Sequence, residues 1–68
     1  MKKIVTVDYN GRSYKSDAIE DGEWLIDSIK AVLTERYNYI SFYNGDVKYF
    51  FNANVLNNSV ISVEEVKE

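Results

Sequence analysis

The chain has 68 residues, with 11 acidic and 8 basic side chains and a formal net charge of −3 at pH 7. It contains neither cysteine nor histidine, which excludes disulfide bonds, thiolate metal sites and the commonest general base. A chain of this length makes one domain at most, so we expect residues 1–68 to form a single small domain with a thin core.

The beginning of the sequence shows neither the apolar stretch of a signal peptide nor a membrane-spanning run. We therefore expect a cytoplasmic protein without a membrane partner. Lys, Asn, Ile, Tyr and Phe are abundant and proline is absent, which is typical of AT-rich coding. This composition favours a bacterial or phage origin.

The first predicted hairpin lies at the start of the chain. Residues 3–9 alternate between apolar and polar side chains, and this period of two predicts a half-buried strand. Asn10 and Gly11 follow, and both residues tolerate the positive φ angles of a two-residue type I′ turn. The resulting register places Val7 opposite Tyr14 on the apolar face.

A second hairpin is predicted from residue 39 to residue 51. Ile40 and Phe42 share a face with Val47, Tyr49 and Phe51, whether the turn lies at residues 44–45 or at 45–46. The triplet Tyr-Asn-Gly occurs before both predicted turns, but the buried positions of the two copies do not align. The repeat therefore indicates shared turn chemistry and no duplicated binding motif.

Between the hairpins, residues 22–36 predict one amphipathic helix. Apolar residues recur at helical spacing, namely Leu25, Ile26, Ile29, Val32 and Leu33. Asp21 is the expected N-cap, and Arg36 at the end suits the helix dipole. Trp24, in the first turn, is expected to anchor the core.

The Asn-rich segment 52–59 predicts a loop in which Val55 and Leu56 form an apolar plug. Alternation at Ile61 and Val63 predicts a final strand. The sum is an α+β protein of order β-β-α-β-β-β, in which a single amphipathic helix packs on one face of a mainly antiparallel sheet. The pattern does not determine the strand order.

No catalytic arrangement emerges from the sequence. Glu64 and Glu65 are adjacent in a strand and point to opposite faces, which makes them a poor acid and base pair. Gly11, Gly22 and Gly45 are too far apart for a phosphate-binding loop. We therefore expect a protein that is no enzyme and binds neither a cofactor nor a metal.

The second hairpin also carries aromatic residues on the face opposite to the core. If the helix covers only one face, Tyr39, Tyr43 and Phe50, together with Val60, form an exposed patch typical of a protein interface or a homodimer. The alternative is burial of the rings under the C-terminal segment. Nucleic-acid binding is not expected, because stacked bases need a basic groove and only Lys48 lies among the rings.

A run of acidic residues between Lys15 and Lys30 suggests a different function. Its members are Asp17, Glu20, Asp21, Glu23 and Asp27. Such a cluster is ordinary at the start of a helix, but it also suits a small acidic inhibitor that binds a host protein by imitating a row of phosphates. The leading hypothesis remains a non-catalytic interaction module that uses the aromatic sheet face.

Overall fold

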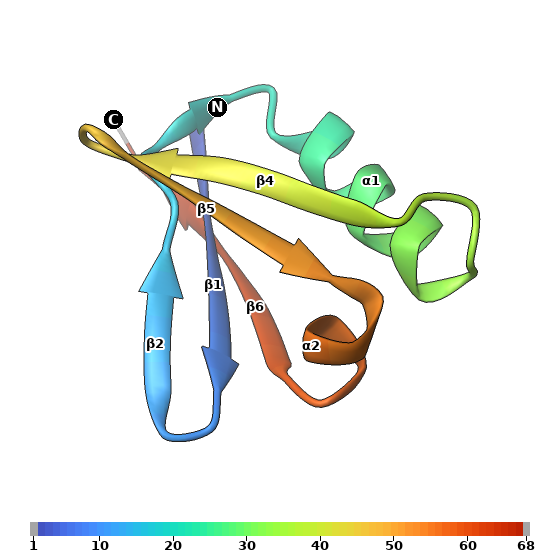
Figure 1. Ribbon diagram of the computed structural model, residues 1–68. Coiled ribbons are helices and arrows are strands. Elements are labelled where there is room, and N and C mark those ends of the chain that lie inside the picture. Colours follow the sequence, from blue (N-terminus) through green and yellow to red (C-terminus); the bar gives the residue numbers. More distant parts are fainter. Residues whose placement is uncertain (1, 68) are drawn as a thin grey trace.

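The computed structural model describes residues 2–67, which form two antiparallel sheets and two helices (Figure 1). The elements in chain order are β1 (Lys2–Tyr9), β2 (Arg12–Lys15), β3 (Ile19–Glu20), α1 (Glu23–Leu33), β4 (Tyr39–Asn44), β5 (Val47–Asn52), α2 (Ala53–Asn57) and β6 (Val60–Val66). The predicted α+β class is confirmed. The order differs from the prediction by two short elements, β3 and α2.

The larger sheet is built around β1. Strands β2 and β3 pair with successive parts of one edge of β1, and β6 pairs with the other edge from Lys2 to Asp8. The predicted pairing of Val7 with Tyr14 is confirmed. The turn between β1 and β2 has φ angles of 52° at Asn10 and 83° at Gly11, as a type I′ turn requires.

The smaller sheet is the β4–β5 hairpin. Its last pair before the turn is Asn44 with Val47, so Gly45 and Asp46 form the two-residue loop. Gly45 has a φ angle of 59°, and glycine at the first loop position is typical of a type II′ turn. The structure therefore selects the later of the two turn positions that the sequence leaves open.

The ends of α1 differ from the prediction. The N-cap is Gly22, and no side chain caps the helix there; Asp21 instead lies in the preceding turn with a φ angle of 51°. The helix ends at Leu33 because Glu35 adopts a φ angle of 63°. The expected cap at Asp21 and the expected end at residue 36 are both wrong.

Segment 52–59, predicted as a loop, contains the short helix α2. The Asn52 side chain accepts a hydrogen bond from the Val55 backbone N–H at 2.9 Å, which caps the first turn of the helix. Leu56 is buried and Val55 partly buried against the core, so the segment does insert an apolar plug.

The core lies between the larger sheet and a second layer formed by α1, α2 and the β4–β5 hairpin (Figure 1). It contains one cluster of buried side chains, namely Val5, Val7, Leu25, Ile29, Val32, Ile40, Phe42, Phe51 and Leu56. Tyr14 reaches into this cluster from β2, with its ring centroid 5.8 Å from that of Phe51.

Segment 15–17 joins the two sheets and fixes the end of the hairpin. The Asp17 backbone N–H donates to the Tyr43 carbonyl oxygen at 2.8 Å, and the Asn44 side chain donates to the Lys15 carbonyl oxygen at 2.8 Å. The Asp17 carboxylate accepts from the Gly45 N–H at 3.1 Å. These bonds hold the β4–β5 turn against the larger sheet.

Candidate functional site

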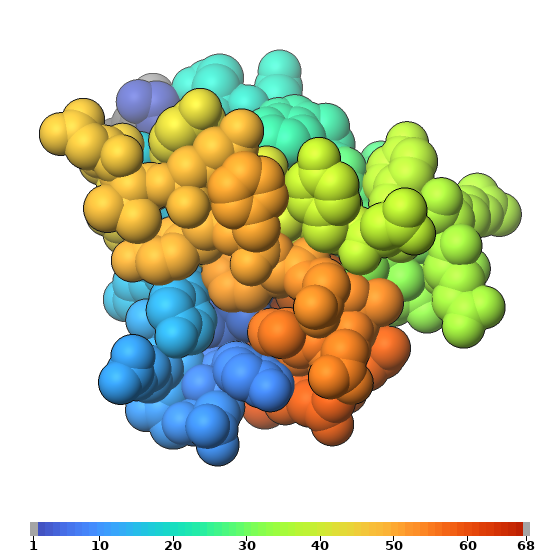
Figure 2. Space-filling view, in the orientation of Figure 1, coloured from blue at the N-terminus to red at the C-terminus, as the bar shows by residue number. Residues whose placement is uncertain are grey.

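The outer face of the β4–β5 hairpin carries a group of exposed aromatic side chains. Tyr39, Tyr43 and Phe50 are 57%, 55% and 63% exposed. The ring centroids of Tyr39 and Phe50 are 5.8 Å apart, and Lys48 Nζ lies 5.2 Å from the ring centroid of Tyr43 and 5.3 Å from that of Phe50. These four side chains form one continuous surface, which we call the aromatic face. The hairpin lies at the front of the molecule in Figure 2.

The inner face of the hairpin explains why these rings stay outside. Strand alternation sends Phe42, Tyr49 and Phe51 inward, where the ring centroids of Phe42 and Phe51 are 5.0 Å apart. Tyr14 packs edge-on against Tyr49, with a centroid separation of 5.2 Å. The core side of the hairpin is thus already filled with aromatic contacts.

Val60 does not belong to the aromatic face. It lies in β6, paired with Asp8 of β1, and is 69% exposed. Asp8 alternates with the buried Val7, so Val60 lies on the outer face of the larger sheet. The expected patch therefore keeps its three aromatic members and loses Val60.

Trp24 was expected in the core, and this expectation is wrong, because its side chain is 55% exposed. The buried stripe of α1 follows Leu25, Ile29 and Val32. Trp24 is one residue from that stripe and is therefore rotated by about 100° around the helix axis. It shares a side of the helix with Ser28, whose hydroxyl donates to the Trp24 carbonyl oxygen at 2.8 Å.

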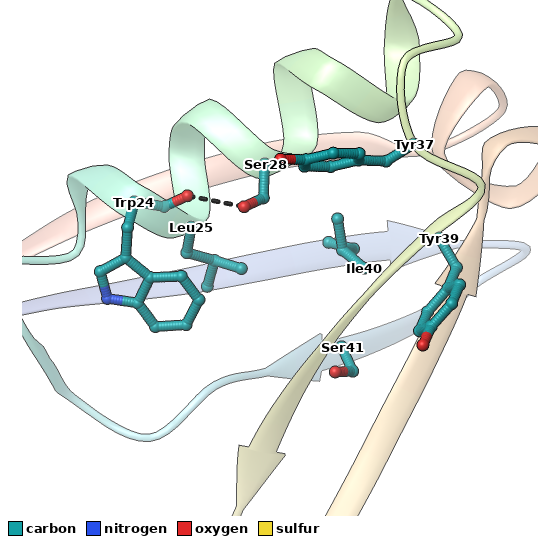
Figure 3. A pocket seen from close by; sticks show the side chains of 7 residues that line it. All are labelled: Trp24, Leu25, Ser28, Tyr37, Tyr39, Ile40 and Ser41. Atoms are coloured by element: carbon teal, nitrogen blue, oxygen red, sulfur yellow. Dashed lines mark hydrogen bonds between the residues drawn. The ribbon is translucent and has the colours of Figure 1, made fainter.

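A groove, which we call the edge groove, runs between α1 and β4 (Figure 3). It consists of two hollows of about 250 Å³ and about 410 Å³, and Trp24 and Ser41 line both. Leu25 and Ile40 lie between the helix and the strand, and Tyr37 lies beside α1 (Figure 3). The second hollow extends to Asp17, Tyr43 and Lys48.

The five acidic residues are divided among different structural roles. The Asp17 carboxylate binds the Gly45 N–H, and Glu23 forms an ion pair with Lys3. The hydrogen bond with Lys3 lowers the pKa of Glu23 below its usual value. Glu20 lies in β3 and Asp27 on the exposed side of α1. At least two of the five carboxylates thus stabilise the fold.

Residues 2–67 contain no group of three or more His, Cys, Asp or Glu side chains arranged to hold a metal ion. Within the same residues, no helix is long and apolar enough to cross a membrane. In comparisons with known proteins, the chain matches no family model, no curated protein and no solved structure.

Proposed function

We propose that this chain is a small non-catalytic interaction module that self-associates through the aromatic face. The observation that carries the proposal is the joint exposure of Tyr39, Tyr43 and Phe50 on one side of a two-stranded hairpin. Scattered exposed hydrophobic residues are ordinary, whereas large rings gathered on one surface are typical of interaction sites.

The chemistry of the aromatic face suits an interface. Tyr and Phe provide large apolar surfaces with few rotatable bonds, so burying them costs little side-chain entropy. Tyr hydroxyl groups keep their polar ends available at the rim of a contact. The Lys48 ammonium already lies over two rings, where cation–π attraction keeps the cation beside the apolar surface. Two copies related by a two-fold axis would bury the same face on both.

The acidic inhibitor remains the alternative proposal. It would act through the field of Asp17, Glu20, Asp21, Glu23 and Asp27. The bonds of Asp17 to Gly45 and of Glu23 to Lys3 reduce the number of carboxylates available to a partner. Salt distinguishes the two proposals, because charge mimicry weakens steeply as ionic strength rises, whereas an aromatic contact responds little.

The test is the solution mass by light scattering behind a sizing column, at micromolar concentration. We expect a dimer for the wild type and a monomer for the double variant Tyr43→Ser, Phe50→Ser, with circular dichroism close to that of the wild type. Both side chains are more than half exposed, so their loss leaves the core filled.

Val60→Ser is the matched control. It also removes an exposed apolar side chain from a strand, but outside the aromatic face. This variant should keep the mass of a dimer. A monomeric wild type would contradict self-association, and a double variant that unfolds would show that the rings support the fold.

A further inference from the structure

The free edge of β4 is a second candidate interaction surface. Within residues 2–67, β4 pairs with β5 alone, so its other edge has no neighbouring strand. Asn44 and Val47 flank the two-residue turn as a hydrogen-bonded pair. In β4, the residues that alternate with Asn44 direct their backbone N–H and C=O groups away from β5. Tyr43, Ser41 and Tyr39 are those residues. The bond from Asp17 N–H to the Tyr43 carbonyl oxygen shows this direction.

The backbone of Ser41 is the centre of this edge. In the part of the chain that the structure describes, no hydrogen bond reaches the edge-facing N–H and C=O of Ser41. Ser41 also lines both hollows of the edge groove, as does Trp24. The groove thus combines an unpaired donor and acceptor on the strand side with an exposed indole on the helix side.

We propose that the edge groove binds an extended segment of a partner protein, which adds to β4 as a third strand. The unpaired Ser41 groups favour an extended backbone, since antiparallel strand addition satisfies such a donor and acceptor together. The Tyr43 carbonyl oxygen already accepts a hydrogen bond from the Asp17 N–H, which limits the free edge on that side. The added segment would therefore pair over about three to five residues.

Side chains of the added strand would alternate between the groove and solvent. The position facing the groove meets the exposed ring of Trp24, below which Leu25 and Ile40 are buried, so an aliphatic or aromatic residue suits it. Both ends of the groove have charged side chains nearby. Asp17 and Lys48 lie at one end, and Arg36 lies near the other. The partner segment is therefore selected by its apolar, alternating pattern and not by net charge.

A second copy of the hairpin does not fit this groove. If β4 of a second copy paired with β4 of this molecule, the β5 strand of that copy would follow about 4.8 Å further out. In this molecule α1 stands across the groove from β4 (Figure 3) and takes that space. The groove therefore has no room for a second hairpin. It borders the aromatic face, because Tyr39, Tyr43 and Lys48 line its hollows, whereas Trp24 belongs to the groove alone and Phe50 to the aromatic face alone.

The experiment selects displayed linear peptides of about ten random residues against the full chain. We expect enriched peptides to alternate apolar and polar residues. A synthetic copy of the most enriched peptide should protect the Ser41 amide of the ¹⁵N-labelled chain from hydrogen exchange. Failure to enrich any peptide, or binding that leaves the Ser41 amide unprotected, would overturn the proposal.

Two variants test the groove by different means. Ser41→Pro removes the edge-facing N–H without removing a bond to β5, and Trp24→Ser removes an exposed wall of the groove. Each should weaken binding of the selected peptide by about tenfold or more. If Ser41→Pro does not fold, Trp24→Ser decides the question, and unchanged affinity there would overturn the proposal.

Phe50→Ser is the matched control. Phe50 is an exposed ring of the aromatic face that does not line the edge groove. The variant should bind the peptide as the wild type does while its tendency to dimerise falls. Trp24→Ser should show the reverse pattern, so the two proposals fail separately.

Discussion

Single residues with positive φ decide where both hairpins turn. Gly11 and Gly45 have φ angles of 83° and 59°, a region in which a β-branched side chain is poorly tolerated. A Cβ atom built on either glycine has no neighbour within 4 Å. The cost of a substitution would therefore come from backbone strain and not from crowding.

We expect Gly11→Val and Gly45→Val each to lower the free energy of unfolding by about 1–3 kcal/mol. The measurement is thermal or denaturant unfolding followed by circular dichroism. Asn at the same positions is the control and should cost less, because Asn tolerates the left-handed region. An unchanged midpoint in a valine variant would show that the turn does not determine that hairpin.

An ion pair links the start of β1 to the start of α1. Lys3 Nζ donates to Glu23 Oε1, and this bond lowers the pKa of Glu23 from its usual 4.5 and raises the pKa of Lys3 from 10.5. A lowered carboxyl pKa stabilises the fold above the ordinary pKa, and the contribution is lost as pH falls through the folded-state value. The Lys3 contribution is present below 10.5 and is lost as pH rises through its raised pKa.

The pH dependence of unfolding should therefore change in Glu23→Gln. From about pH 6 to about pH 3, the thermal midpoint of the wild type should fall more than that of the variant. The difference should be small, because the Glu23 side chain is 68% exposed and water screens the pair. Parallel curves for the two proteins would contradict a role of this ion pair in stability.

At the scale of elements, α1 ends in a Schellman motif without glycine. The Arg36 N–H donates to the Ala31 carbonyl oxygen at 2.7 Å and the Glu35 N–H to that of Val32 at 3.1 Å. Glu35 takes the left-handed position that glycine usually occupies in this motif. A periodic pattern could not reveal this end, because the apolar stripe carries no signal for a non-glycine residue at positive φ.

Glu35→Gly should raise the free energy of unfolding by about 0.5–1 kcal/mol. Relief of left-handed strain is worth about 1–2 kcal/mol, and the greater freedom of glycine in the unfolded chain offsets about 0.4–1 kcal/mol. The control is Ala31→Gly inside α1, which should lower stability by about 0.5–1 kcal/mol. A loss of stability in Glu35→Gly would contradict this account of the helix end.

The two elements that the sequence did not predict, β3 and α2, are both short. β3 has two residues and α2 has five, too few for a period of 2 or 3.6 to be recognised. The Asn density of segment 52–59 favours a loop, but the side chain of Asn52 acts as a helix cap. By contrast, the Asn-Gly signals predicted both hairpins and the apolar stripe predicted α1, although the second turn lies one residue later and the ends of α1 differ.

At the scale of the whole molecule, the sequence could not give the strand order. β1 is central because it is paired along both edges. One of its partners is β6, so the first and the last strand of the sequence lie side by side. That return places Val60 on the larger sheet, away from the aromatic face. Strand phase alone predicted which side of the hairpin Tyr39, Tyr43 and Phe50 occupy, whereas the exposure of Trp24 depends on how α1 is rotated against the core.

In the proposed dimer, two copies of the chain meet at the aromatic face. An isotope-filtered NOE experiment on a mixture of ¹³C-labelled and unlabelled chains tests it most directly, because it detects contacts only between different molecules. We expect intermolecular NOEs from the ring protons of Tyr39, Tyr43 and Phe50. The absence of intermolecular NOEs at these rings, or NOEs confined to the outer face of the larger sheet around Val60, would contradict the account.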